Sequence, residues 1–352
     1  MPAGRSLQRE RIRLYLRIIA VSAVLGAGYG FVLGLDGRSP LLNLVVGIVN
    51  SILIAGSIAG IEIFLLREGS SMKRLLGLPF VAVVLLKTLV YAAIIAAVIS
   101  GGVRAFVLLF PGKVQAAPLD PNTELVTIGV SLATTLFFVV VLQAAGLLGR
   151  RTFRNLMLGR YRRPRAERRF FLFVDVIGST AIAERLGPLE AHRFLAAVFS
   201  ATAEPIAACR GEVYQYVGDE IVVTWTEAEG KPEARPLRCF FLMEAALLDL
   251  DGHFRSTFSA EPRLRAALHL GEVIAGEVGE VRRAIVYHGD VMNTASRLEQ
   301  ATRDAGVRFI ASAAAVDALE KQPDLEYRDL GALALRGRKE PIRAWSVELS
   351  RP

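Results

Sequence analysis

Only two cysteines, Cys209 and Cys239, occur in the 352 residues of the chain. Two cysteines cannot build a disulfide framework, and there is no Cys-x-x-Cys pair or Cys/His cluster to favour structural zinc. This scarcity fits a reducing compartment. Hydrophobic residues make up 53% of the chain, which excludes intrinsic disorder. The mean hydropathy of +0.40 is too high for a soluble two-domain enzyme, so part of the chain is expected in lipid.

Long uncharged apolar runs are confined to the first half of the chain. A helix that crosses a bilayer core needs about 20 apolar residues. We therefore predict that residues 1–149 form a membrane domain of four transmembrane helices, at about 15–35, 41–66, 77–100 and 124–148. The lipid bilayer is accordingly the first expected partner.

Basic residues border these runs unevenly. They precede the first run, separate the second from the third and follow the fourth. Because Lys and Arg collect on the cytoplasmic side, we expect a multi-pass protein of the cell inner (plasma) membrane with both termini cytoplasmic. Glu62 and Lys87 lie within the runs and are costly in lipid. We predict a structural ion pair between them; the alternatives are a ligand or proton site, or a small transporter.

Residues 150–169 carry nine arginines and one glutamate. This basic juxtamembrane segment is expected to bind anionic lipid or to act as a short transmitter helix that pairs across a dimer, and both roles can hold together. The remaining residues, 170–352, carry 21 basic and 27 acidic side chains, so no nucleic-acid partner is expected.

A first polar motif follows the apolar, strand-length run of residues 170–176, which contains Asp175. The next residues, IGST, are typical of a tight turn, and a helical pattern extends from Ala181 to about Ala207. A carboxylate at a strand end, followed by Gly and Ser/Thr at a helix start, suits a phosphate and its cation. The alternative is an aspartate that only caps the helix.

A second motif lies in EVYQYVGDEIVVTW, residues 212–225. Two alternating strand patterns meet at Gly218 and Asp219, which predicts a β-hairpin. If this hairpin lies beside the first strand, Asp219 and Asp175 converge and can hold a pair of divalent cations. Mg²⁺ prefers few carboxylates together with phosphate oxygens and water, so the arrangement indicates a nucleotide site.

A third motif is VYHGDVMNTASRLEQ, residues 286–300, in which a strand passes through Gly289 and Asp290 into a helix. Asn293 and Arg297 are four residues apart and share one face of that helix. An amide and a guanidinium presented together suit a ribose and a phosphoryl group that gains charge. The alternative is a solvated polar helix face.

In this order the three motifs resemble those of the class III nucleotidyl cyclases, the adenylate and guanylate cyclases. FVDVIGST is similar to the family's first metal motif, QYVGDE to its second and NTASR to its transition-state motif, and the resemblance covers about residues 168–348. It implies that residues 170–352 form an α+β, ferredoxin-like catalytic domain. It also implies a head-to-tail homodimer with two shared active sites, because the chain has one such domain.

The resemblance assigns a role to each matching residue. It implies that two Mg²⁺ or Mn²⁺ ions per site are bound by side chains and one backbone carbonyl, and that three amides hold phosphates. The metal ligands are Asp175, Asp219 and the Val176 carbonyl, and the amides are those of Gly178, Ser179 and Thr180. Asn293 and Arg297 would come from the partner chain and act on the ribose and the α-phosphate.

Three positions depart from the family pattern. Gln215 stands where adenylate cyclases usually have a lysine, and Val286 replaces its usual partner, so the base-recognition pair is atypical. Arg336 replaces a phosphate-binding lysine, with Arg338 as a rival. We expect ATP as the substrate and 3′,5′-cyclic AMP plus pyrophosphate as products. The alternatives are a guanylate or relaxed-specificity cyclase, and a catalytically weak nucleotide-binding signalling module.

Overall fold

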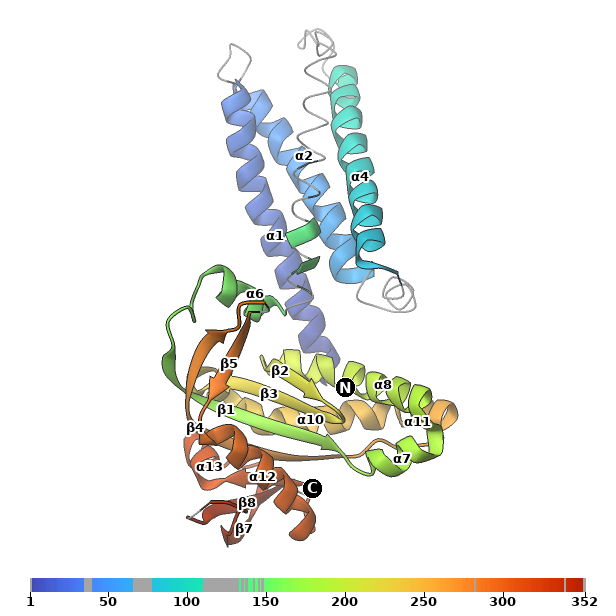
Figure 1. Cartoon of the computed structure of the whole chain (residues 1–352). Helices are drawn as coiled ribbons and strands as arrows, with labels where there is room; N and C mark the ends of the chain where they lie inside the picture. The colour runs from blue at the N-terminus through green and yellow to red at the C-terminus, as the bar shows by residue number, and fades with distance from the viewer. Residues whose placement is uncertain are drawn as a thin grey trace. The chain divides into compact units, whose positions relative to one another are not determined.

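The computed structural model describes residues 2–34, 40–65, 78–109 and 149–350 apart from 282 and 339, with scattered residues between 133 and 146. The chain divides into two compact units, Met1–Leu148 and Gly149–Pro352. Figure 1 shows the elements of both units.

The elements described in the N-terminal unit are helices. It comprises α1 (Pro2–Gly34), α2 (Pro40–Gly60), the π-helical turn η1 (Ile61–Leu65) and α4 (Phe80–Leu109). Within the described residues, three stretches are long and apolar enough to cross a membrane: Tyr15–Val32, Asn43–Phe64 and Val81–Ile99. They match the first three predicted spans and support membrane association. The fourth predicted span, 124–148, falls mostly outside the described residues.

Close contact between α1 and α2 depends on glycine. A methyl group added at Gly30 would collide with the backbone carbonyl of Asn43, and one added at Gly47 would collide with that of Gly26. The two backbones therefore approach closely, as small residues permit between membrane helices.

Glu62 and Lys87 form an ion pair in this unit, as predicted. The Nζ atom of Lys87 donates to Oε1 of Glu62 at 2.7 Å, and the Tyr91 hydroxyl donates to the same oxygen. Glu62 lies on η1, and Lys87 and Tyr91 lie on α4. The pair thus joins two candidate spans and leaves neither charge alone in an apolar environment.

The C-terminal unit is built on a mixed sheet of eight strands (Figure 1). They are β1 (Arg165–Val176), β2 (Glu212–Val217), β3 (Glu220–Thr226), β4 (Leu264–Val278), β5 (Ala284–His288), β6 (Phe309–Ser312), β7 (Leu325–Leu333) and β8 (Ile342–Leu349). The order is β2-β3-β1-β4-β6-β8-β7, and β5 pairs with β4. Strand β1 is central and antiparallel to both β3 and β4.

Helices cover both faces of this sheet. They are α6 (Arg150–Met157), α7 (Ser179–Leu186), α8 (Pro188–Ala208), α9 (Glu227–Gly230), the 3₁₀ turn η2 (Pro232–Ala234), α10 (Arg235–Asp249), α11 (Asp251–Phe258), α12 (Asp290–Asp304) and α13 (Ala313–Leu319). Alternate residues of β1 face opposite sides. Phe170 packs in the cluster that includes α8 and α10, whereas Phe171 packs in the cluster that includes α12. The predicted α+β class is confirmed.

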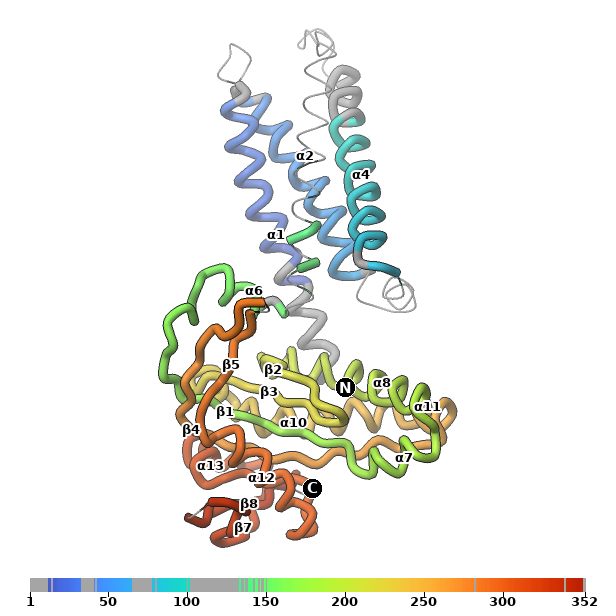
Figure 2. Tube along the Cα trace, viewed as in Figure 1, coloured from blue at the N-terminus to red at the C-terminus, as the bar shows by residue number. Residues whose placement is uncertain are grey.

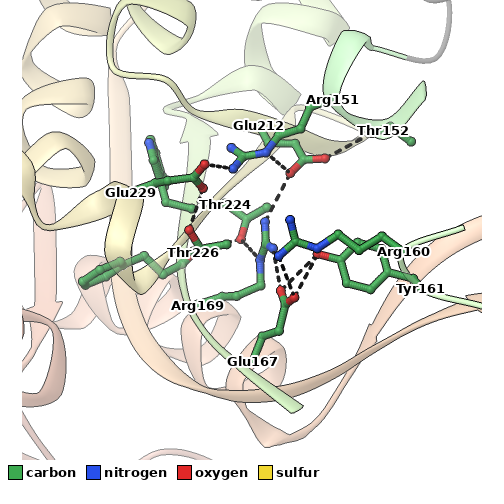
Figure 3. Close-up of polar contacts among 12 residues, drawn as sticks. Arg151, Thr152, Arg160, Tyr161, Glu167, Arg169, Glu212, Thr224, Thr226 and Glu229 are labelled. Carbon is green, nitrogen blue, oxygen red and sulfur yellow. Dashed lines mark hydrogen bonds and ion pairs between the residues drawn. The ribbon is translucent and has the colours of Figure 1, made fainter. Parts of the chain in front are cut away.

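Helix α6 is tied to the sheet by polar side chains (Figure 3). Glu212, the first residue of β2, accepts a hydrogen bond from the Thr152 hydroxyl at 3.1 Å and lies 3.7 Å from Nε of Arg151. Its carboxylate also accepts from Nη2 of Arg169 on β1 at 3.2 Å. Arg151 further pairs with Glu229 of α9. Helix α6 therefore belongs to the C-terminal unit.

Two predicted boundaries are wrong. The border between residues 169 and 170 cuts through β1, because the strand begins at Arg165 and the Arg169 side chain is only 1% exposed. A run of charged residues in the sequence suggests a linker. Here, however, Arg169 is buried in the sheet because it pairs with the carboxylates of Glu167 and Glu212. The helix predicted from Ala181 to Ala207 is split into α7 and α8, because Gly187 adopts a positive φ of 77° directly before Pro188.

Candidate functional site

Asp175 and Asp219 meet at one end of β1. Asp175 is the penultimate residue of β1 and stands opposite Glu220, the first residue of β3, in the antiparallel register. Asp219 precedes Glu220 at the tip of the β2–β3 hairpin, where Gly218 takes a φ of 61°. Figure 2 traces the chain from β1 through α7 and α8 into this hairpin. The predicted convergence of the two aspartates is therefore present.

The two carboxyl groups differ in their electrostatics. Burial raises the pKa of Asp175, as does the Asp219 carboxyl within hydrogen-bonding reach, although Arg265 opposes the rise. Burial acts in the same upward direction on Asp219, but hydrogen bonds from the Ser179 hydroxyl and from Asp175 lower its pKa overall. Burial and the neighbouring carboxyl thus make Asp175 the stronger proton holder of the two, and a bound cation would favour the charged form of both groups.

Arg265 of β4 is the main partner of Asp175. Its Nε and Nη2 atoms donate to Oδ2 of Asp175 at 2.7 and 2.5 Å, because the β1–β4 register places the two residues opposite each other. Nη2 of Arg303 on α12 lies 3.5 Å from the same oxygen. Sequence reasoning missed both arginines, since only the strand register brings residue 265 beside residue 175.

Two further acidic side chains lie beside this pair. Burial, together with Glu299, Asp175 and Asp219, raises the pKa of Glu220 to about 7. Burial and the nearby Asp175 also raise the pKa of Glu299. The end of β1 therefore gathers more negative charge than its arginines balance.

The predicted phosphate-binding residues begin α7. Gly178 takes a φ of 72° and precedes the first residue of the helix, and no side chain caps the free amides there. The Ser179 hydroxyl instead donates to Oδ2 of Asp219. Amides at the start of a helix attract an anion, so a phosphate held there would lie beside the aspartate pair.

A second group of predicted residues lies around α12. Asn293 is exposed, and a methyl group added at Gly337 would lie 3.4 Å from Nη2 of Arg297. Arg297 is therefore beside the turn that carries Arg336, whose side chain is exposed. Arg338, the alternative phosphate ligand, donates a hydrogen bond to Asp290 on α12. Arg336 therefore stays the predicted phosphate ligand.

The two groups occupy different places within one chain. Among the described residues, no hydrogen bond or ion pair joins Arg297 to either aspartate. The residue of α12 that reaches Asp175 is Arg303, six positions further along, which lies on another face of the helix because six residues turn it well past one full revolution. The chain thus has an acidic group of predicted site residues, Asp175 and Asp219, and a basic group, Asn293, Arg297 and Arg336.

The predicted base-recognition residues lie on β2 and β5. Gln215 is exposed on β2 and Val286 is half-buried on β5. Their neighbours, Tyr214 and Tyr287, touch with ring centroids 5.0 Å apart. Because adjacent residues of a strand face opposite sides of the sheet, this contact does not place Gln215 and Val286 beside each other, and their joint role in base recognition stays a prediction.

The donor set at the aspartate pair fits a hard divalent cation. Asp175 and Asp219 offer carboxylate oxygens, the ligands that Mg²⁺ prefers. Across the residues that the structure describes, no group of three or more His, Cys, Asp or Glu side chains is placed to hold a metal. A Mg²⁺ ion on these two carboxylates would take its other ligands from water or from the oxygens of a bound phosphate compound.

Comparisons with known proteins agree with this geometry. The family model of the adenylate and guanylate cyclase catalytic domain matches residues 164–348. Adenylate cyclase 2 of Rhizobium meliloti (strain 1021) is 37% identical over 219 residues, which cover 62% of this chain and 60% of that protein. Adenylate cyclase 1 of the same organism is 29% identical over 179 residues, 50% of this chain and 27% of that protein. The chain therefore spans less than two thirds of the length of these relatives.

The fold also has a counterpart among solved structures. A bacterial light-regulated adenylyl cyclase has a TM-score of 0.51 and 21% identity, over 61% of this chain and 63% of that chain. At this identity the likeness concerns the fold alone. The family model covers more than half of the chain, and it includes the aspartate pair, the start of α7 and the Asn293–Arg297 face of α12. The chain therefore belongs to the class III nucleotidyl cyclases.

Proposed function

We propose that the chain is a membrane-anchored adenylate cyclase that converts ATP to 3′,5′-cyclic AMP and pyrophosphate. The observation that carries this proposal is the pairing of Asp175 with Asp219 beside the uncapped start of α7. Two adenylate cyclases among the relatives support the choice of reaction. The three apolar helices support anchoring in a membrane.

The acidic half-site binds the reacting end of the substrate. Asp175 and Asp219, with the Val176 carbonyl, hold two Mg²⁺ or Mn²⁺ ions, and the amides of Gly178, Ser179 and Thr180 hold the terminal phosphates. When bound, the ions acidify the ribose 3′-hydroxyl and neutralise phosphate charge. The 3′ oxygen attacks the α-phosphorus, its proton leaves to solvent, and pyrophosphate departs. No protein nucleophile takes part.

The basic half-site acts on the ribose and the α-phosphate. Asn293 orients the ribose, Arg297 stabilises charge that develops on the α-phosphate, and Arg336 binds phosphate. Because Arg297 lies beside Gly337 rather than beside the aspartates of its own chain, we infer that a partner chain supplies it. Two chains that pair head to tail form two complete sites.

The identity of the base is the least constrained feature of the substrate. The Gln215 amide can donate to adenine N1 or, turned over, accept from guanine N1. Val286 has no polar side-chain atom and adds no acceptor for guanine. The proposal therefore favours ATP, with a guanylate or relaxed-specificity cyclase as the alternative.

The catalytic unit lies in the cytoplasm in this proposal, with both termini on that side of the inner (plasma) membrane. The segment of residues 150–169 acts as a transmitter and contacts anionic lipid. Its helix α6 is bound through Arg151 and Thr152 to Glu212, the first residue of β2 (Figure 3). Strand β2 leads into the hairpin that carries Asp219, so a displacement of α6 would act on the metal site through its polar contacts with Glu212 and then along β2.

A product assay on the purified full chain tests the proposal. With Mn²⁺, we expect cyclic AMP from ATP at a higher rate than cyclic GMP from GTP. A preference for GTP would establish the guanylate cyclase alternative. Binding of either nucleotide without any cyclic product would instead indicate the non-catalytic signalling module.

A further inference from the structure

We propose that Arg338 is a positioning residue that anchors the turn of residues 335–338 to the start of α12 and thereby holds Arg336 in place for a phosphate. This inference rests on the proposed function, in which Arg336 binds phosphate. It gives Arg338 a role other than that of a second phosphate ligand. The turn lies between β7 and β8 and beside Arg297 of α12.

Residues 335–338 form a four-residue turn. The backbone amide of Arg338 donates to the Leu335 carbonyl at 3.1 Å, and Gly337 takes a φ of 72°. A positive φ at the third position is what a type II turn requires, and glycine adopts it without strain. Arg336 therefore occupies the second position, at an exposed corner of the turn.

Both ends of this turn are attached to α12. At the first position, Leu335 is 6% exposed and packs in one apolar cluster with Leu298 of α12. At the fourth position, Nη1 of Arg338 donates to the Thr294 hydroxyl at 2.5 Å and to Oδ2 of Asp290. The exposed corner of the turn is thus held between an apolar and a polar anchor.

The polar anchor is a closed group of three side chains. The buried Thr294 hydroxyl also donates to Oδ2 of Asp290 at 3.2 Å, so that oxygen accepts from both partners. Asp290 is 58% exposed, and an ion pair in that position is weak when it stands alone. The buried hydroxyl, one helical turn along α12, fixes the geometry that an exposed pair lacks. Nε of Arg338 is buried without a hydrogen bond to the described residues, so the anchor depends on Nη1.

A neighbouring histidine does not compete for this anchor. Burial and, to a smaller extent, Arg338 lower the pKa of His269 on β4 to about 4, although Asp290 opposes the shift. His269 is therefore uncharged at pH 7, and its Nδ1 lies 2.8 Å from the Ser312 hydroxyl. The Asp290 carboxylate is left to the guanidinium of Arg338.

The competing view is that Arg338 leaves Asp290 and binds a phosphate itself. The two views differ for the double variant of Arg336 and Arg338. If Arg338 acts through Arg336, its loss has no further effect once Arg336 is gone, whereas two independent phosphate ligands give effects that multiply. The views also differ for Asp290→Asn, which releases Arg338. The KM for ATP should rise in the first view and stay the same or fall in the second.

Steady-state kinetics of the purified full chain with ATP and Mn²⁺ separate these outcomes. We expect Arg336→Met to raise the KM for ATP about 10-fold and Arg338→Met about 5-fold, with kcat changed less than about 2-fold, because the weakened contact is with phosphates already bound in the ground state. The inhibition constant of pyrophosphate, which probes the phosphate contacts alone, should rise by the same factors. The double variant should match Arg336→Met.

Two results would overturn the inference. One is a further rise of about 5-fold in the KM of the double variant over Arg336→Met. The other is a raised KM in Arg338→Met with no effect of Arg336→Met, which would make Arg338 the ligand. Arg343→Met is the matched control, because Arg343 is an exposed arginine of β8 that forms an ion pair with Asp329 of β7. It should leave both constants unchanged.

A second variant covers the case in which Arg338→Met does not fold in a melting assay. Asp290→Asn is close in shape and removes the charge from the other side of the anchor, and it should raise the KM for ATP about 3-fold. An unchanged or lower KM in Asp290→Asn would contradict the anchor. A wild type that forms no cyclic nucleotide would contradict the proposed function and this inference with it, whereas a wild-type KM in Arg338→Met would overturn the inference alone.

Discussion

The two ends of strand β1 each bury an arginine among carboxylates, but they differ in charge balance. At the α6 end, Arg169 donates from each of its three guanidinium nitrogens: Nε to the Thr224 hydroxyl at 3.1 Å, Nη1 to Glu167 at 3.0 Å and Nη2 to Glu212 at 3.2 Å (Figure 3). Its guanidinium also lies 4.6 Å from the ring centroid of Tyr287. Arg151 adds a second positive charge beside Glu212.

At the other end, carboxylates outnumber the buried guanidinium groups. Arg265 faces Asp175 and Glu299, while Arg303 is 58% exposed and therefore screened by water. The pKa values of Asp175, Glu220 and Glu299 are all raised, chiefly by burial and also by neighbouring carboxylates.

The difference in charge balance between the two ends of β1 suggests different roles for the two charge clusters. A buried charge cluster whose donors and acceptors match stabilises a particular arrangement of strands, and removal of one member leaves an uncompensated charge. A cluster with excess negative charge is complete only when a cation arrives. The difference in charge balance supports a structural role for the α6 end of β1 and the proposed reaction site at the Asp175 end.

The largest expected effect is on catalysis at the acidic end. Asp175→Asn removes a metal ligand and part of the carboxylate repulsion, so cyclic nucleotide formation should fall about 1,000-fold or more. The melting temperature measured in a chelator should stay the same or rise, because a repulsive charge is lost. If Asp175→Asn kept its activity, or lost it only because it unfolded, the proposal that this end of β1 serves catalysis rather than stability would be contradicted.

The balanced end should respond in stability instead. Arg169→Met leaves Glu167 and Glu212 without their shared cation, and the free energy of unfolding should fall by about 3 kcal/mol. Chemical denaturation of the full chain, followed by circular dichroism of the catalytic unit, measures this change. Arg168→Met is the control, because Arg168 is 53% exposed, and it should change stability by no more than about 0.5 kcal/mol. Equal effects of the two substitutions would mean that the network contributes nothing.

A smaller, pH-dependent effect is expected for Glu220. Its pKa is raised from 4.5 to about 7 in the folded state. Between pH 4.5 and about 7, the folded state therefore keeps a proton on Glu220 that the unfolded state has released. The wild type therefore loses stability as pH rises through that window. Glu220→Gln has no such proton to lose. Above pH 7 its free energy of unfolding should exceed that of the wild type by about 1 kcal/mol, a value reduced from the full pKa shift because Glu220 is partly exposed. Melting curves in a chelator should coincide near pH 4, and a gap that does not vary with pH would contradict this account.

Sequence patterns predicted the parts of the site that lie in local motifs. The strand before Asp175, the hairpin turn at Gly218 and the passage from β5 into α12 each follow from a few consecutive residues, and all three are confirmed. The class III resemblance added roles that no local pattern contains.

Features set by strand pairing were not predicted. Arg265 and Asp175 are 90 residues apart in the chain and meet only through the β1–β4 register. The start of β1 was missed for a similar reason. Arg169 can be buried there only because Glu167 and Glu212 lie beside it and neutralise its charge. A short stretch of sequence does not show which distant residue will neutralise a buried charge.

The central claim is that two chains together complete each active site, and mixed dimers test it most directly. Asp219→Ala and Arg297→Ala chains, each inactive alone, carry different purification tags and are co-expressed, and heterodimers are isolated through both tags. One of the two sites in such a dimer has both halves intact, so about half of the wild-type cyclase activity per dimer is expected. Verified heterodimers that form no cyclic nucleotide would contradict the shared site.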